Sequence, residues 1–205
     1  MEDIEAIAWQ KAHEDDLWIF DKLIVSRKLG YNCGPAGMNV PTPDNYIVRP
    51  CVNIPGMSKG AKFLKLEKET DHLPPGYFWC EIFKGRHLSI DYKNGKQVLA
   101  VEGFRNKENE LWKFSKWKKV DDLVPLPSIF YSLILKYEYI NIEFIDNKPI
   151  EIHLRHNPDF VWGNSVAIPI WLGDDIANSV PDYEEESFLR FVNAPDQNRK
   201  GFWID

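Results

Sequence analysis

The sequence has few cysteines and no long hydrophobic run. Its three cysteines, Cys33, Cys51 and Cys80, are an odd number without the spacing of metal ligands, which is typical of free thiols in a reducing compartment. No apolar run approaches the roughly 18 residues that a membrane helix needs. The acidic N-terminus, Met-Glu-Asp-Ile-Glu, lacks the basic and apolar regions of a secretory signal. We therefore expect a cytoplasmic protein that has no membrane partner.

An excess of positive charge is also lacking. The formal net charge of -6 argues against nucleic acid as the main partner. Four lysines do gather beside Trp112 and Trp117: Lys113, Lys116, Lys118 and Lys119. We interpret this patch as a solvated strand or loop. The chain has 205 residues, of which 44% are hydrophobic and eight are tryptophan. These values predict a globular chain that forms one large domain or two closely packed lobes.

The most informative segment runs from Ile140 to Asn157. Apolar and polar residues alternate in both of its halves, as expected for two strands that each have one apolar face. Matching the two apolar faces fixes the register. A two-residue loop would set Glu143 opposite Ile150, whereas a three-residue loop at residues 146–148 sets Glu143 opposite Glu151. We therefore predict a hairpin with the three-residue loop.

Two carboxylates that face each other across a strand pair repel unless something positive lies between them. Arg155 or a divalent cation would serve. Glu143, Glu151 and Asn157 form a set of oxygen ligands that suits Mg²⁺, which is usually held by one or two carboxylates together with substrate phosphates. The alternative is an ordinary solvated face of an antiparallel sheet.

The rest of the chain predicts a mixture of helices and strands. An amphipathic helix is expected over residues 17–29, with Gly30 as its C-terminal cap. Strands are expected at 46–52 and 61–66 around a glycine-containing loop, and two more between 76 and 92. Asn94-Gly95 is a strong hairpin signal, and residues 127–137 have helical periodicity.

In their order along the chain, these motifs resemble the ATP-grasp family over roughly residues 20–160. Asp21-Lys22 before a helix ending in Leu29-Gly30 is similar to the family's opening element. Tyr46 to Pro50, with Arg49 in place of the usual lysine, resembles the strand that contacts ATP phosphates. The segment from Phe78 to Asp91 resembles the hinge strand with its following glycine and Ser-x-Asp strand. Glu143 and Glu151-Ile-His153-Leu-Arg155 resemble the magnesium carboxylates and the Glu-x-Asn-x-Arg end of the site.

The resemblance implies a role for each matching residue. Lys22 and Arg49 would contact phosphates, and Arg155 would contact the transferring phosphoryl group or the acceptor carboxylate. Glu81 would contact the ribose or the adenine edge. Gly56, Lys59 and Gly60 would belong to a loop that covers the phosphates. Glu143 and Glu151 would be the magnesium ligands.

The implied fold is α+β, with two lobes of mostly antiparallel sheet and a nucleotide cleft between them. We expect one ATP-grasp-like domain over residues 1–205, with an N-terminal lobe at about 20–75 and a C-terminal lobe at about 76–205. Only about twenty residues precede Asp21, so we expect no separate N-terminal acceptor-binding domain.

The implied activity is an ATP- and Mg²⁺-dependent ligase that joins a carboxylate to an amine through an acylphosphate. Its partners would be a nucleotide and two acceptor substrates, a carboxylate and an amine. Peptides and proteins are included among these acceptors. Two alternatives stay open. One is a catalytically degenerate nucleotide-binding or partner-binding module, which His153 in the place of a ligand asparagine favours. The other is a kinase of the same family.

Overall fold

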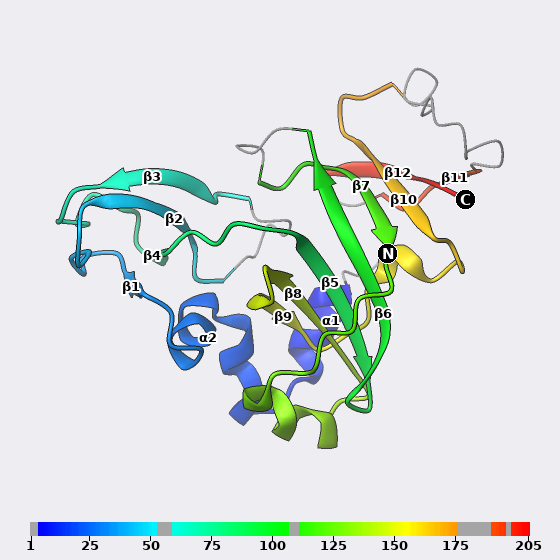
Figure 1. The fold of residues 1–205 in the computed structure, drawn as a ribbon, viewed down its shortest axis with the longest axis horizontal. Coiled ribbons are helices and arrows are strands. Elements are labelled where there is room, and N and C mark those ends of the chain that lie inside the picture. The colour runs from blue at the N-terminus through cyan, green and yellow to red at the C-terminus, as the bar shows by residue number, and fades with distance from the viewer. Residues whose placement is uncertain (1–3, 53–58, 107–110, 176–189, 196–197) are drawn as a thin grey trace.

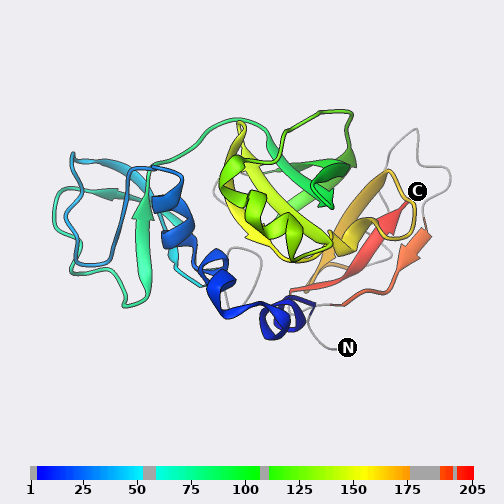
Figure 2. The ribbon, with the colours of Figure 1, turned by 90° about the horizontal axis from the view of Figure 1, so that it is seen from below.

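The computed structural model describes residues 4–52, 59–106, 111–175, 190–195 and 198–205. Within these residues the strands form two antiparallel sheets, one four-stranded and one eight-stranded. Figures 1 and 2 show the small sheet at one end of an elongated molecule and the large sheet in its middle and at its other end. The prediction of an α+β fold with two mostly antiparallel sheets is confirmed.

The small sheet has the strand order β1-β4-β2-β3. Its strands are β1 (Cys33–Pro35), β2 (Asp44–Pro50), β3 (Lys62–Leu66) and β4 (Tyr77–Cys80). Buried aromatic and aliphatic residues form its core: Val40, Tyr46, Val48, Leu66, Leu73 and Trp79. Because β4 belongs to this sheet, the sheet extends to Cys80, past the lobe boundary that we predicted near residue 75.

The large sheet has the order β11-β12-β10-β7-β6-β5-β8-β9. Its strands are β5 (His87–Lys93), β6 (Lys96–Arg105), β7 (Phe114–Lys119), β8 (Tyr139–Ile145), β9 (Lys148–His153), β10 (Val166–Trp171), β11 (Arg190–Val192) and β12 (Arg199–Ile204). Asn94 and Gly95 join β5 to β6 with φ angles of 47° and 75°, values that asparagine and glycine tolerate better than other residues. The predicted Asn-Gly hairpin is confirmed.

The helices are short. They are α1 (Ile4–Lys11), η1 (Glu14–Phe20), α2 (Lys22–Lys28), η2 (Ser128–Leu135) and η3 (Pro158–Phe160), where η marks a 3₁₀ helix. The single helix predicted over residues 17–29 is wrong, because Asp21 divides it. Asp21 has φ and ψ of -94° and 103°, and its Oδ1 accepts hydrogen bonds from the N–H groups of Leu23 and Ile24. An aspartate in this conformation begins a new helix. The predicted stop at Gly30 is confirmed by its left-handed φ of 76°.

The main core lies between one face of the large sheet and the helices η1, α2 and η2. The sheet contributes alternate residues of β5, β8 and β9: Leu88, Ile90, Tyr92, Ile140, Ile142, Phe144 and Ile152. The helices contribute Ile19, Phe20, Val25, Phe130 and Leu133. Residues 14–28 therefore pack against the large sheet, although part of this segment was predicted to belong to the N-terminal lobe. Because strand side chains alternate, the opposite face of β5, β8 and β9 is left for polar residues.

No helix in the described parts of the chain is long and apolar enough to span a membrane.

Candidate active site

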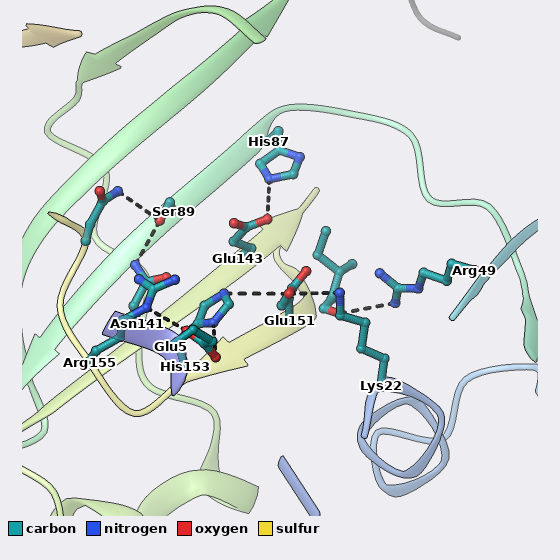
Figure 3. Close-up of polar contacts among 12 residues, drawn as sticks. Glu5, Lys22, Arg49, His87, Ser89, Asn141, Glu143, Glu151, His153 and Arg155 are labelled. Carbon is teal, nitrogen blue, oxygen red and sulfur yellow. Dashed lines mark hydrogen bonds and ion pairs between the residues drawn. The ribbon is translucent and has the colours of Figure 1, made fainter. Parts of the chain in front are cut away.

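The polar face of the large sheet carries the candidate site. Alternate residues of β5, β8 and β9 share this face: His87, Ser89, Asp91, Asn141, Glu143, Glu151 and His153. Figure 3 shows that the side chains of Lys22, on α2, and Arg49, on β2, point toward the same face. The face is therefore made by segments that are far apart in the sequence.

The hairpin of β8 and β9 has the predicted register but not the predicted turn. Glu143 lies opposite Glu151 and Asn141 opposite His153, as expected. The turn, however, has two residues, Asp146 and Asn147, with φ angles of 49° and 63°. The predicted three-residue loop is wrong. A bulge between Glu143 and Phe144 shifts the register by one residue, so that both carboxylates keep the same face despite the shorter turn.

Each of the two opposed carboxylates has its own positively charged or hydrogen-bonding partner. The Nζ atom of Lys22 lies 2.8 Å from Oε1 of Glu151, and both side chains are nearly buried. Nε2 of His87 lies 3.0 Å from Oε2 of Glu143. Asp21 is the N-cap of α2, so Lys22 is the first residue of that helix, and its side chain reaches Glu151 from this position. Arg155, which we considered as the positive partner of these carboxylates, instead contacts Glu5.

His87 connects Glu143 to the partly buried guanidinium group of Arg105. Nη2 of Arg105 lies 3.2 Å from Nδ1 of His87. Because a guanidinium can only donate, Nδ1 accepts this hydrogen bond and the proton of the imidazole lies on Nε2, which donates to Glu143. The rings of Phe114 and Trp117 meet the imidazole edge to face, with centroids 5.0 and 5.6 Å from its own. These contacts fix the orientation of His87.

The environment of Glu143 favours its charged form. Burial alone would raise the pKa of the carboxyl group. The hydrogen bond from His87 and the positive charges of His153 and Lys22 outweigh this effect and hold the pKa of Glu143 well below its usual range. The carboxylate is therefore ionised at neutral pH.

A third carboxylate enters the site from α1. Oε1 of Glu5 lies 2.9 Å from Nδ1 of His153, and Oε2 lies 2.6 Å from Nε of Arg155. Since a carboxylate only accepts, Nδ1 of His153 carries a proton. Burial raises the pKa of Glu5, but the charges and hydrogen bonds of His153 and Arg155 lower it overall to about 2.

Arg49 joins the small sheet to the hairpin. It is only 7% exposed, and its Nη2 donates to the carbonyl oxygen of Ile150 at a distance of 3.1 Å. Ile150 is the residue that the bulge leaves without a cross-strand partner. Nε of Arg49 has no hydrogen-bond partner among the described residues. A buried guanidinium N–H without a partner is costly, and a ligand oxygen would relieve that cost.

Of the other predicted nucleotide-binding residues, Lys59 and Gly60 lie between β2 and β3, and Glu81 directly follows β4. Gly60 has a left-handed φ of 85° and, like Lys59, follows a segment that the structure does not describe. Gly56 lies outside the described residues. Oε1 of Glu81 accepts a hydrogen bond from the backbone N–H of Asn32 at 2.9 Å. The nucleotide-binding roles of these residues stay predictions.

Asn157 belongs to a neighbouring polar cluster. Its backbone N–H donates to both oxygens of Asp91 at 3.0 Å, and its Oδ1 accepts from the N–H of Asp159. Asn141 Nδ2 also donates to Asp91 and Ser89, each at 2.8 Å. The structure therefore connects Asn157 to β5, while Glu143 and Glu151 face each other across β8 and β9.

The described residues contain no group of three His, Cys, Asp or Glu side chains arranged to hold a metal ion. Mg²⁺, however, is usually bound through one or two carboxylates and the phosphates of a substrate. Glu143 and Glu151 supply two such carboxylates on one face. The donor set thus fits a magnesium ion that a nucleotide brings with it.

Several residues of this face were not found from the sequence. His87 alternates with Ser89 and Asp91 along β5, but its partner Glu143 is 56 residues away. Glu5 is 148 residues from His153, and Arg105 is the last residue of the long strand β6. The only local signal was that His87 alternates with Ser89 and Asp91 and so lies on the same face of its strand. The other contacts depend on the tertiary fold.

No family model matches the sequence, and the search of curated proteins found no match. Among solved structures, N5-carboxyaminoimidazole synthetase from Staphylococcus aureus, complexed with ADP, aligns with a TM-score of 0.59 and 10% identity. The alignment covers 92% of this chain and 67% of the synthetase. L-amino acid ligase from Bacillus licheniformis aligns with a TM-score of 0.44 and 13% identity, over 70% of this chain and 42% of the ligase.

A proposed ATP-grasp superfamily protein from Archaeoglobus fulgidus aligns with a TM-score of 0.46 and 17% identity. This alignment covers 80% of the present chain and 62% of the other. The chain therefore spans less than two thirds of the Archaeoglobus protein. The similarity to the synthetase shows that the chain has the ATP-grasp fold.

Proposed function

We propose that the protein is an ATP- and Mg²⁺-dependent ligase that joins a carboxylate to an amine or a similar nucleophile. The observation that carries the proposal is the arrangement of two opposed carboxylates, Glu143 and Glu151, beside two nearly buried cations, Lys22 and Arg49. Burying so much charge in one place stabilises a fold poorly. It suits a polyanionic ligand such as a nucleoside triphosphate.

Lys22 and Arg49 would bind the phosphates. Lys22 extends from α2 and Arg49 from β2, and Figure 3 shows both side chains pointing toward the hairpin of β8 and β9. Arg49 has an Nε group with no hydrogen-bond partner in the described chain, so it has capacity for one more acceptor. An arginine can also contact phosphate oxygens through two N–H groups at once.

Glu143 and Glu151 would hold Mg²⁺, which would neutralise part of the phosphate charge when it is bound. The hydrogen bond from His87 keeps Glu143 ionised and orients it. Lys22 keeps Glu151 in place at 2.8 Å. Such outer contacts orient the carboxylates before the ligand arrives.

In the proposed reaction a carboxylate oxygen of the acceptor attacks the γ-phosphorus of ATP, and the bond to the β,γ-bridging oxygen breaks to release ADP. The nitrogen of an amine then attacks the acylphosphate carbon, loses a proton and displaces phosphate. Lys22 and Arg49 would hold the phosphates in line with the acceptor, and Arg155 would orient the acceptor. Positioning and charge stabilisation account for most of the catalysis in phosphoryl transfer.

The second candidate is a module that binds a nucleotide without turning it over. His153 favours it, because this residue takes the place of a ligand asparagine in the motif and its Nδ1 donates to Glu5. Imidazole is a poor ligand for a hard cation. A kinase of the same fold is a third candidate, and it would transfer the same phosphoryl group directly to its acceptor.

The test is Mg²⁺-dependent release of ADP across a panel of carboxylates and amines, with peptides and proteins included. Glu151→Gln should lose most of the rate and still bind nucleotide, because the carboxylate acts mainly on charge that develops in the transition state. Glu67→Gln is the matched control, since Glu67 is 72% exposed and lies in an ordinary surface ion pair with Lys65. Nucleotide binding without any ADP release by the wild type would favour the binding module.

A further inference from the structure

Glu5 is held in the way that a bound carboxylate ligand would be held. Its two oxygens contact two different donors, Nδ1 of His153 at 2.9 Å and Nε of Arg155 at 2.6 Å. Two charge-assisted hydrogen bonds to one carboxylate are a common mode of carboxylate recognition. His153 is the last residue of β9 and Arg155 follows it by two residues, and their side chains are only 10% and 18% exposed.

This pair of donors lies beside the proposed phosphate site. Nε2 of His153 is 3.8 Å from Oε1 of Glu151, and Lys22 contacts the same oxygen from the other side. Figure 3 shows Lys22, Glu151, His153 and Glu5 in one continuous row. A carboxylate bound by His153 and Arg155 would thus be adjacent to the phosphates that Lys22 is proposed to bind.

Helix α1, which carries Glu5, is loosely packed. Ala8 is its only buried residue, and Trp9 is 42% exposed even though it contacts the ring of Phe20. A cavity of about 420 Å³ remains between α1 and the segments around η2 and the end of β9. It is lined by Ile4 and Ile7 on the side of α1 and by Leu154 and Arg155 opposite them. Because α1 fills the space beneath it incompletely, its release would expose little that is now well packed.

The surroundings of the cavity suit a peptide that carries negative charge. On the side opposite α1, Lys136 and Arg155 line it with one carboxylate, Glu138, and the apolar residues there offer contacts for the rest of a side chain. Lys136 also contacts Asp16 at 3.0 Å, so its charge is partly balanced. The donor pair already accommodates a glutamate side chain that is presented by a polypeptide backbone.

We propose that His153 and Arg155 bind the carboxylate of an acidic side chain on an acceptor peptide, and that Glu5 of α1 occupies this site as an internal competitor. The inference rests on the proposed function, since it names the acceptor class of the same site. Binding of the acceptor then requires displacement of Glu5. If Glu5 is docked in nine molecules out of ten, the apparent affinity for the acceptor falls about tenfold.

The experiment measures the binding of a small probe in the absence of nucleotide. The probe is glutamate with both backbone ends blocked, as the N-acetyl N′-methylamide, and the blocked glutamine is its neutral analogue. Binding is followed by the NMR signal of the Arg155 Nε–H group and by calorimetry. Glu5→Gln should bind the charged probe at least about tenfold more tightly than the wild type does. Glu14→Gln removes one exposed charge near the same end of the chain and should match the wild type.

A second variant shows where the probe binds. Adding Arg155→Met to Glu5→Gln should abolish binding, and the Tm of each variant confirms that it is folded. If Glu5→Gln and the wild type bind the probe with equal affinity, Glu5 is not an internal competitor. If the blocked glutamine binds as tightly as the blocked glutamate, the site does not recognise a carboxylate. If free glutarate binds as tightly as the blocked glutamate, the acceptor is a small dicarboxylate and the peptide assignment is wrong.

The proposed function is tested separately in the same variants by titration with ATP and Mg²⁺. Binding of ATP without binding of the probe would overturn only the acceptor assignment. Binding of the probe by a protein that neither binds ATP nor releases ADP would instead refute the ligase, and with it the role of the probe site as an acceptor site.

Discussion

The ion pair between Lys22 and Glu151 should be strongly coupled energetically. The two side chains are 7% and 13% exposed, and their charged atoms are 2.8 Å apart. Two unit charges at this distance attract by about 6 kcal/mol at an effective dielectric constant of 20. Desolvation offsets much of this attraction, so the intact pair adds little net stability.

Breaking the pair is different, because it leaves one charge buried without its partner. Lys22→Met and Glu151→Gln should each lower the free energy of unfolding by about 3 kcal/mol. The double variant removes both charges and should cost no more than either single variant, because the intact pair itself adds little net stability. The expected coupling energy is therefore at least about 3 kcal/mol, obtained from a double-mutant cycle of urea unfolding curves.

The exposed pair of Lys93 and Glu138 is the matched control. Its side chains are 42% and 62% exposed and its atoms are 3.1 Å apart, so the same cycle should give less than about 1 kcal/mol. Additive effects of Lys22→Met and Glu151→Gln would refute the reasoning. They would mean that Lys22 and Glu151 do not interact in the folded protein, and the orientation proposed for the site would lose its support.

Three further predictions concern single residues. Arg49→Ala should weaken binding of ATP much more than binding of adenosine in calorimetry, and equal losses for both ligands would remove Arg49 from the phosphate site. Gly103→Ala should lower the free energy of unfolding in urea by about 1 to 3 kcal/mol. The reason is that a Cβ atom there would lie 2.5 Å from the ring of Phe114 and 2.8 Å from that of Trp117. An unchanged unfolding midpoint would contradict this packing. The pKa of Glu5 is lowered from 4.5 to about 2, so its contribution to stability is complete above pH 4.5 and is lost as the pH falls toward 2. The measurement is a ¹³C NMR titration of its carboxyl group. A midpoint near 4.5 would show that the contacts of Glu5 are absent in solution.

Local patterns in the sequence predicted β2 to β6, β8 and β9, but not β1, β10, β11 or β12. The alternation around Glu143 and Glu151 fixed which residues share a face, and the pairing of these two carboxylates is as expected. The turn was predicted wrongly, because the parity argument assumed a regular ladder. The bulge at Ile150 adds one residue to β9, and an apolar residue gives no sign that it is bulged.

The break at Asp21 shows a similar limit. The apolar spacing of residues 17–29 suits one helix, yet the side chain of Asp21 competes for backbone N–H groups and begins a second one. The signal was present in the sequence, since aspartate is a preferred N-cap residue. It carried less weight in the prediction than the apolar periodicity did.

Most of the candidate site depends on contacts between distant segments. Lys22 and Glu151 are brought together by packing of α2 on the edge of the large sheet, and His87 meets Glu143 through the pairing of β5 with β8. No local period encodes such distances. The resemblance to ATP-grasp proteins suggested Lys22 and both carboxylates as site residues, but it did not suggest Glu5.

The most direct test of the central claim is the effect of ATP and Mg²⁺ on thermal unfolding. A ligand at 100 times its dissociation constant adds about 2.7 kcal/mol, which for a chain of this size raises the Tm by roughly 5 to 10 °C. We predict such a shift with ATP and Mg²⁺ together, a smaller shift when Mg²⁺ is left out, and none with Mg²⁺ alone. An unchanged Tm with ATP, ADP and GTP, each with and without Mg²⁺, would contradict the nucleotide site and the function proposed from it.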